Sequence, residues 1–299
     1  MQKILVVDDE PVIQSMLQDF LESIYDVTVC ANGDSALQQV KLHFFDLVIS
    51  DINMPGMKGY ELLSRIKTIS PETKTVLITA YNVDEYIRLA RTHGICNIIS
   101  KTAPFNFKEL EMLVKGLISG DVFGIEKHLG KGYQVLGAFV IKNSNEAKNV
   151  RSKALKLIPP LPRDENEIKL VFDEIITNAI YHSPMLESGQ KKYEEYKYIE
   201  LQKEEYIHVT IGQDEEKICI SILDRQGNLD KDRVIFLIDR HVNAEGIFDE
   251  SGRGIYMSRL FSDRIHINID PGNMTEFIIM YYRNPNAFKG YKPLYINQL

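Results

Sequence analysis

Five short apolar runs alternate with five helical patterns in the first 120 residues, and this alternation constrains the fold more than any other feature of the sequence. The apolar runs are Ile4–Val7, Val27–Cys30, Leu47–Ser50, Thr75–Thr79 and Asn97–Ser100. The helical patterns are Val12–Ser23, Asp34–Lys41, Tyr60–Ile69, Asp84–His93 and Phe107–Ser119. A strand followed by a helix five times over predicts a doubly wound α/β domain with a five-stranded parallel sheet.

Polar side chains follow the carboxyl ends of four predicted strands. Asp8 and Asp9 follow the first, Asp51 follows the third, Thr79 ends the fourth and Lys101 follows the fifth. In such a sheet these strand ends border one ligand crevice, where three carboxylates repel each other unless a divalent cation holds them together. We expect Asp51 to be the nucleophile on a phosphoryl group, with Asp9 and Asp51 as Mg²⁺ ligands and Asp8 nearby through water. Thr79 and Lys101 would hold the phosphoryl oxygens.

Residues 1–120 resemble a bacterial response-regulator receiver domain. The resemblance rests on the motifs VVDDE, SDINMPGMKG, ITA and ISK, and on Thr79 and Lys101 lying 28 and 50 residues after Asp51. It implies that a sensor histidine kinase phosphorylates Asp51, and that Asn53 is a further Mg²⁺ ligand. An α/β domain with incidental acids is the alternative.

Two positions depart from the receiver pattern. Ile98 stands three residues before Lys101, where the family usually has Tyr or Phe as a rotamer switch. Pro104 is separated from Lys101 by two residues, whereas the family usually has Lys-Pro. We expect the phosphorylation chemistry to survive both departures. The first departure would alter the signalling route from Thr79 to the surface. The second puts in question the cis peptide that the family has after the lysine.

The stretch Ile168–Ser183 predicts an amphipathic helix in the second half of the chain, because its apolar residues recur every three or four positions. Glu174 and Asn178 lie off the apolar stripe and four residues apart, so they share one face. The amide oxygen of Asn178 can ligate Mg²⁺, and the carboxylate of Glu174 can orient or deprotonate an incoming hydroxyl. A core helix with two solvated polar residues is the alternative for this helix taken alone.

Further motifs follow this helix. They are the strand patterns Tyr206–Gly212 and Lys217–Leu223, Asp224 at a strand end, a candidate lid over residues 228–250, glycines 252 and 254 before a helix, and a last strand Glu276–Tyr282. A glycine-rich turn into a helix N-terminus offers free backbone N–H groups and a positive dipole end, which suit phosphates.

Together these motifs, over roughly residues 133–283, resemble the ATP-binding domain shared by sensor kinases, gyrase-type ATPases and anti-sigma-factor serine kinases. The sequences DEIITNAIYHS and GRGIYMSRLFSD place the resemblance closest to the anti-sigma-factor branch. It implies an α+β sandwich that binds ATP and Mg²⁺. By position it assigns Mg²⁺ to Asn178, the general base to Glu174, the adenine amino group to Asp224 with Thr275 near it, the phosphates to Gly252, Arg253 and Gly254, and a pocket position to His182. Gln226 departs from the family, which usually has Gly there, and would crowd the pocket unless Gly227 compensates through a shifted turn.

The predicted organisation is a receiver domain over residues 1–120, a linker over 121–132 and a histidine-kinase-like ATPase domain over 133–299. Residues 189–205 are charge-dense with alternating Lys and Glu, which predicts a solvated insertion. His128 in the linker lacks the two long helices and the following acid that surround a sensor-kinase phosphoacceptor, so an ordinary surface or helix-end histidine is favoured.

Charge and hydropathy narrow the partners. The net charge of −7 and pI of about 5.6 argue against a nucleic-acid partner. No stretch approaches ~18 uninterrupted apolar residues, so no transmembrane helix is expected, and MQKILVVDDE lacks the features of a signal peptide. Three scattered cysteines, at positions 30, 96 and 219, predict buried thiols in a reducing cytoplasm.

The two halves together predict a cytoplasmic two-component response regulator, phosphorylated on Asp51, whose output is an ATP-dependent Ser/Thr protein kinase of the anti-sigma-factor type. The expected partners are a sensor histidine kinase and a downstream regulator such as an anti-sigma antagonist or a sigma factor, and a homodimer is plausible. One alternative is a phosphorylation-gated binding module that uses ATP only structurally. Another is an atypical histidine kinase with His128 or His182 as the acceptor.

Overall fold

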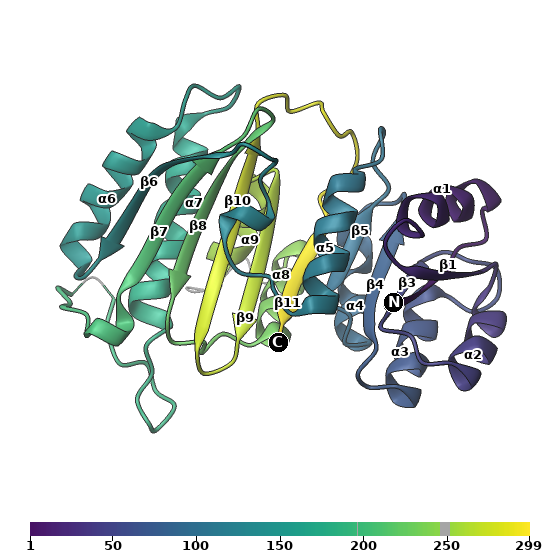
Figure 1. Ribbon diagram of the computed structural model, residues 1–299. Coiled ribbons are helices and arrows are strands. Elements are labelled where there is room, and N and C mark those ends of the chain that lie inside the picture. The colour runs from purple at the N-terminus through teal and green to yellow at the C-terminus, as the bar shows by residue number, and fades with distance from the viewer. Residues whose placement is uncertain (196, 246–251) are drawn as a thin grey trace. The chain divides into compact units, whose positions relative to one another are not determined.

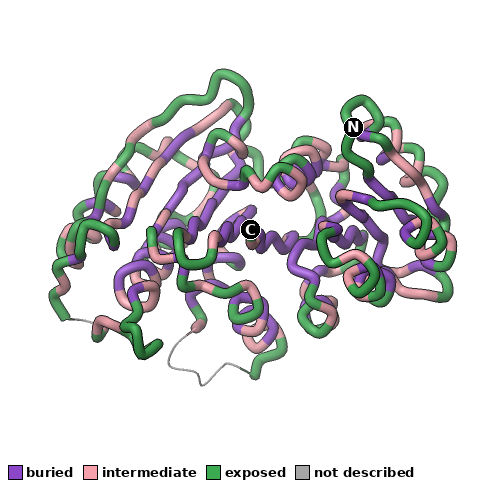
Figure 2. Tube along the Cα trace, turned by 60° about the horizontal axis from the view of Figure 1, so that its bottom comes forward, coloured by how far each residue is buried: buried purple, intermediate pink, exposed green. Residues whose placement is uncertain are grey.

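The computed structural model describes residues 1–195, 197–245 and 252–299, and these form two compact units. The first unit contains residues 1–121 and 288–295, and the second contains residues 122–287 and 296–299. Figure 2 shows that buried residues concentrate in the strands of each unit, whereas exposed residues lie on loops and outer helix faces. No helix among the described residues is long and apolar enough to cross a membrane.

The first unit is a doubly wound α/β domain, as the alternation predicts (Figure 1). Its elements are β1 (Lys3–Val7), α1 (Pro11–Leu21), β2 (Asp26–Cys30), α2 (Gly33–Leu42), β3 (Leu47–Asp51), α3 (Gly59–Ile69), β4 (Lys74–Thr79), η1 (Val83–Tyr86), α4 (Ile87–Thr92), β5 (Asn97–Ser100) and α5 (Phe107–Ser119). The five strands are parallel in the order β2-β1-β3-β4-β5. The prediction of a five-stranded parallel sheet is therefore confirmed.

Local sequence signals set several helix starts in this unit. Pro11 occupies the first turn of α1, where its missing N–H costs nothing. The side chains of Asn32 and Asn106 accept hydrogen bonds from Ser35 N at 2.9 Å and Glu109 N at 3.2 Å, which caps α2 and α5. The helix predicted over Asp84–His93 is divided into the 3₁₀ turn η1 and the short α4.

The C-terminal segment 288–295 packs in the first unit, although sequence analysis placed all of 133–299 in the second domain. Strand β11 (Leu294–Gln298) pairs antiparallel with β5 through Leu294 opposite Ile98 and Tyr295 opposite Asn97. Pairing gives β5 hydrogen-bonding partners on the side that the parallel strands leave open. The Tyr295 side chain is 1% exposed and joins the apolar core of this unit.

Tyr295→Ala is expected to lower the free energy of unfolding by about 3–5 kcal/mol, because it removes a buried aromatic ring from the core. Tyr291 lies in the same segment with 48% of its surface exposed, so Tyr291→Ala is the matched control and should change stability by less than about 0.5 kcal/mol. Urea denaturation of both variants measures the difference. Equal effects would show that Tyr295 is not a core residue of the first unit.

The second unit has an antiparallel sheet with helices on one face, an α+β arrangement. Its elements are η2 (Ile125–Lys127), β6 (Gln134–Ile141), α6 (Ser144–Leu157), α7 (Glu165–Thr177), η3 (Asn178–His182), η4 (Lys203–Glu205), β7 (Ile207–Gln213), β8 (Lys217–Asp224), α8 (Lys231–Val242), α9 (Arg253–Phe261), β9 (Arg264–Asp270) and β10 (Met274–Tyr282). The strand order is β9-β10-β8-β7-β6, with all neighbours antiparallel. Figure 1 shows α6, α7 and α9 behind this sheet, with the chain around η2 in front of it.

Two predicted elements of this unit differ from the structure. The helix expected over Ile168–Ser183 ends at Thr177 and continues as one π-helical turn, in which Ser183 N donates to Asn178 O at 2.9 Å. Such turns are often found at functional sites. The candidate lid over 228–250 contains α8, and residues 246–250 of that prediction lie outside the described residues.

Candidate functional site

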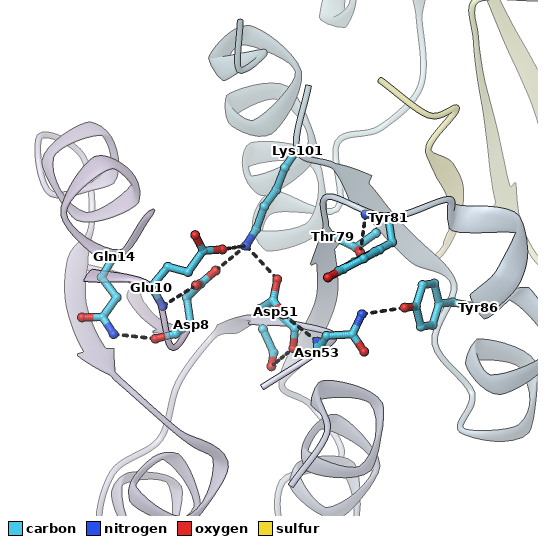
Figure 3. A network of polar contacts seen from close by, with 10 residues as sticks. Asp8, Glu10, Gln14, Asp51, Asn53, Thr79, Tyr81, Tyr86 and Lys101 are labelled. Carbon is cyan, nitrogen blue, oxygen red and sulfur yellow. Dashed lines mark hydrogen bonds and ion pairs between the residues drawn. The ribbon is translucent and has the colours of Figure 1, made fainter. Parts of the chain in front are cut away.

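A buried acidic cluster lies at the carboxyl ends of β1, β3 and β5 (Figure 3). The Lys101 amine lies 2.7 Å from Asp51 Oδ1, 2.9 Å from Asp8 Oδ2 and 3.4 Å from Glu10 Oε1. Asp8 is fully buried and Asp51 is nearly so, whereas Asp9 is exposed. Three of the predicted residues, Asp8, Asp51 and Lys101, are therefore in direct contact.

Burial and the neighbouring charges shift the pKa values of Asp8 and Lys101 in this cluster. Burial raises the pKa of the Asp8 carboxyl, although its hydrogen bonds and the Lys101 charge oppose the shift. Burial by itself would lower the pKa of Lys101, but the hydrogen bonds and charges of Asp51 and Asp8 outweigh it and raise that pKa. Lys101 is therefore held in its cationic form beside Asp51, where it can neutralise an incoming anionic group.

Backbone geometry fixes the orientation of Asp51. Its Oδ2 accepts from Asn53 N at 2.6 Å, which leaves Oδ1 toward Lys101. Gly59 is required at its position, because a Cβ there would lie 1.9 Å from the carbonyl oxygen of Asp51. Thr79 ends β4, and its hydroxyl accepts from Tyr81 N at 3.0 Å. The loop after β3 thus holds the carboxylate in place.

The predicted cation ligands are only partly assembled. Within the described residues, no group of three or more His, Cys, Asp or Glu side chains is arranged to hold a metal ion. The Asn53 side chain donates to Tyr86 Oη at 2.5 Å, so its amide nitrogen points toward η1 (Figure 3). The Asp8 and Asp51 carboxylates nevertheless place hard oxygen atoms around the same point, next to the Lys101 amine, and the exposed Asp9 follows Asp8 in the chain. By donor type these oxygens suit a divalent cation, while in this structure the Lys101 amine is the cation between Asp8 and Asp51.

A cavity of about 410 Å³ opens in the second unit. Its walls come from η3, from the strand ends of β8 and β10, and from the starts of α8 and α9. Six predicted residues line it: Asn178, His182, Asp224, Gly252, Gly254 and Thr275. Three other predicted residues, Glu174, Arg253 and Gly227, are not in the lining. The lining also contains five residues that were not predicted as site residues: Ser183, Met185, Lys191, Asn228 and Arg233. Ser183 ends the motif DEIITNAIYHS, and Asn228 and Arg233 lie in the candidate lid, whereas Met185 and Lys191 belong to no motif that signals a pocket.

Asp224 is the buried acid of this cavity. Its Oδ1 accepts from Ser183 Oγ at 2.7 Å and from Gln226 N at 3.0 Å. Burial raises the pKa of Asp224 to about 6, although these hydrogen bonds and one from the Gly227 backbone oppose the shift. A buried carboxyl group whose pKa is raised in this way, at the wall of a cavity, is typical of a binding site.

Thr275 lies opposite Asp224 in the register of β10 and β8. It is 1% exposed and lines the cavity, and its hydroxyl has no hydrogen-bond partner among the described residues. A buried hydroxyl without a partner costs free energy that a bound polar ligand can recover. A carboxylate acceptor and a buried hydroxyl therefore lie opposite each other on two strands that border the cavity.

Glu174 and Asn178 approach the start of α9. A Cβ at Gly254 would lie 2.5 Å from Glu174 Oε2 and 3.3 Å from Asn178 Nδ2, so a larger residue there would displace the Glu174 carboxylate. Burial raises the pKa of Glu174, Asp173 adds to the shift and Arg253 opposes it. Sequence analysis predicted that these residues share one face, and the structure places both beside the glycine-rich turn.

The expected crowding by Gln226 does not occur. The Gln226 side chain donates to Glu204 O at 3.1 Å and does not line the cavity. Gly227 has a φ of +58°, and a Cβ there would lie 2.4 Å from Asp270 O. This left-handed position turns the chain directly after Asp224.

His128 is enclosed in the second unit. Its side chain packs edge-on against His266 with ring centroids 4.6 Å apart, and within the described part of the chain neither ring nitrogen of His128 has a hydrogen-bond partner. Burial, helped by Lys217 and Lys127, lowers the pKa of His128 to about 3. A neutral enclosed imidazole is poorly placed to accept a phosphoryl group.

His128→Leu is expected to reduce the acid sensitivity of the fold. The folded pKa of His128 lies below the unfolded value of 6.5, so only the unfolded state takes up this proton as pH falls from 6.5 toward 3. Between pH 7 and 5 the wild type should therefore lose about 2 kcal/mol that the variant retains. Urea denaturation at both pH values measures this, with exposed His43→Leu as the control. A parallel pH profile for wild type and variant would contradict the burial argument.

A doubly wound parallel sheet with a buried Asp–Asp–Lys cluster at its carboxyl edge defines a phosphoacceptor class of domain. Residues 4–115 match the family described as the response regulator receiver domain. Sporulation initiation phosphotransferase F of Bacillus subtilis is 35% identical over 115 residues, which cover 38% of this chain and 91% of that protein. The chain belongs to the response regulator receiver family through its N-terminal domain.

Other similarities cover the same part of the chain or extend beyond it. The two-component response regulator ARR14 of Arabidopsis thaliana is 28% identical over 185 residues, which cover 57% of this chain and 48% of that protein. The chain thus spans about half the length of the first curated relatives that it matches. The structure of response regulator protein TrrA from Thermotoga maritima, in complex with Mg²⁺ and BeF, is 37% identical with a TM-score of 0.36, and covers 39% of this chain and 99% of that chain.

Proposed function

We propose that this protein is a cytoplasmic two-component response regulator whose second unit is a nucleotide-binding output. A sensor histidine kinase is the proposed donor of the phosphoryl group, and Asp51 is the proposed acceptor. One observation carries the assignment of the output: Asp224 and Thr275 lie opposite each other at the cavity, and the Thr275 hydroxyl has no hydrogen-bond partner among the described residues.

Asp51 has the position and surroundings of a nucleophile. One carboxylate oxygen forms the new bond to phosphorus while the bond from phosphorus to the donor nitrogen breaks, and the donor leaves with that electron pair. Lys101, 2.7 Å from Asp51 Oδ1, and the hydroxyl of Thr79 are the groups that would hold the transferred oxygens. Asp8, Asp9, Asp51 and Asn53 would hold Mg²⁺, which supplies positive charge against the phosphoryl oxygens.

In the second unit, the proposed ligand is ATP with Mg²⁺. Asp224 and Thr275 would hold the base, Asn178 would provide an oxygen for the cation, and His182 lines the same cavity. The N-terminal turn of α9, with Gly252, Arg253 and Gly254, would face the phosphates. The left-handed backbone conformation of Gly227 forms the turn that follows Asp224.

Transfer of phosphate to a downstream Ser or Thr is a second proposed function, and the observation that favours it is Glu174 beside Asn178 and Gly254. A carboxylate with a raised pKa at that place can take the hydroxyl proton of a target protein. The proposed target is an anti-sigma antagonist or a sigma factor. The alternative is a phosphorylation-gated binding module, proposed as a homodimer, in which ATP is only structural.

Calorimetric titration with Mg²⁺ and ATP tests the nucleotide proposal. The wild type should bind, Asn178→Ala should bind far more weakly, and beryllofluoride on Asp51 should shift the affinity if the two units are coupled. Absence of ATP binding by the wild type in both states would refute the nucleotide output. With binding present, Glu174→Ala separates kinase from binding module: the kinase loses transfer to a purified target and keeps nucleotide affinity.

A further inference from the structure

Met185 and Lys191 line the cavity, and Lys191 belongs to the charge-dense segment 189–205 that was predicted to be a solvated insertion. His182 lines the same cavity. Residues 184–192 fold as a tight hairpin, in which Met185 and Lys191 form an antiparallel bridge and Lys192 N donates to Pro184 O at 3.1 Å. The hairpin therefore has a defined backbone and holds Lys191 at the cavity.

Directly after Lys191, a network of three side chains anchors the hairpin. Glu205 is 5% exposed and accepts from Lys192 Nζ at 2.5 Å and from Tyr193 Oη at 2.6 Å. Burial by itself would raise the pKa of Glu205, but the hydrogen bonds from Lys192 and Tyr193 outweigh it and lower that pKa. We call Lys192, Tyr193 and Glu205 the anchor network. It fixes the chain at Lys192, the residue directly after Lys191.

Lys191 lies near the end of the cavity that contains η3. Its Nζ is 3.8 Å from Glu195 Oε1, and the same carboxylate oxygen is 3.1 Å from His182 Nε2. His182 follows Asn178 by one turn of η3. The charge of Lys191 also contributes, after burial, to the lowered pKa of His182. Lys191 is thus a cation near His182, which lies one turn from Asn178, the residue proposed to provide an oxygen for Mg²⁺.

We propose that Lys191 is a specificity-determining residue that binds the phosphate groups of the nucleotide, and that the anchor network positions it. This inference rests on the nucleotide-binding function proposed above. An ammonium group beside phosphate oxygens forms a charge-assisted hydrogen bond, whereas an uncharged nucleoside offers it no partner. Lys191 therefore distinguishes ATP from adenosine, while Asp224 and Thr275 bind the base that both ligands share.

Calorimetry with Mg²⁺–ATP and with adenosine tests this assignment. Lys191→Met should weaken ATP binding about tenfold and leave adenosine binding unchanged. Glu205→Gln should weaken ATP binding in the same direction, because the hairpin loses the carboxylate that anchors it. Lys197→Met is the matched control, since Lys197 lies in the same segment, pairs with Glu194 and does not line the cavity.

The outcomes separate the two proposals. Loss of ATP affinity in Lys191→Met with adenosine binding retained supports the role of Lys191. Unchanged ATP affinity, or an equal loss for ATP and adenosine, overturns it and leaves the nucleotide function standing. A wild type that binds neither ligand refutes the nucleotide function itself, and the role of Lys191 with it.

Discussion

Asp51→Asn is expected to abolish phosphorylation of this protein, with incorporation of phosphate falling at least roughly 100-fold below the wild type. An amide has no carboxylate oxygen to attack phosphorus, and no second described acid occupies the same position against Lys101 and the Asn53 backbone. Phosphate uptake from a small phosphodonor such as acetyl phosphate, followed by gel mobility or mass spectrometry, measures the loss.

Asp26→Asn is a suitable control for the Asp51 variant. Asp26 starts β2, is exposed, and takes no part in the acidic cluster. It should be phosphorylated at the wild-type level. Lys101→Met should keep Asp51 but lose the cation that holds the phosphoryl oxygens, so phosphorylation should be slowed and not abolished. Full labelling of Asp51→Asn would show that another residue is the acceptor.

Asp224→Asn is expected to lower ATP affinity about 100-fold while making the second unit more stable. The binding loss follows because the amide cannot offer a charged acceptor to the base at the floor of the cavity. The stability gain follows from the sign of the pKa shift. Folding raises the pKa of Asp224 from 3.8 to about 6, so the ionised form opposes folding at pH 7. Removing that charge should add up to about 3 kcal/mol, and the gain should disappear as pH falls below 3.8.

Two measurements separate these effects. Calorimetry with Mg²⁺–ATP gives the affinity, and urea denaturation at pH 7 and at pH 4 gives the stability. Asp230→Asn is the control, because Asp230 also lines the cavity but is exposed and caps α8 through Asp232 N at 3.0 Å. A variant that binds ATP like the wild type would exclude Asp224 as the acceptor for the base. A variant less stable than the wild type at pH 7 would contradict the cost of burying the charge.

Much of the receiver unit could be predicted because its signals are local. Alternating runs predicted the five strands, and the fold rule that strand ends border the crevice brought Asp8, Asp51 and Lys101 together correctly. The same rule predicted a cation site, but it could not anticipate that the Asn53 side chain turns toward Tyr86. Side-chain direction depends on the neighbours that folding supplies.

The cavity of the second unit could be predicted only in part. Residues that belong to compact motifs, such as Asn178 and Gly254, were found because their spacing along the chain fixes their geometry. Lys191 and Arg233 were missed because both are exposed charged residues in polar segments, and only the fold brings them to the rim of a cavity. The Gln226 side chain was expected to crowd the cavity, and only its hydrogen bond to Glu204 O shows that it turns elsewhere.

Residues close together in the chain were enough to predict the alternation of elements and the helix caps, and to single out Asp51 as the candidate phosphoacceptor. Tertiary structure alone decided that residues 288–295 return to β5, where Tyr295 enters a core built almost 200 residues earlier. It also decided that Met185 and Lys191 of the hairpin 184–192 line a cavity with helices and strands distant in sequence. Both results depend on which distant segments pack together, and no local pattern records which distant partner will be available.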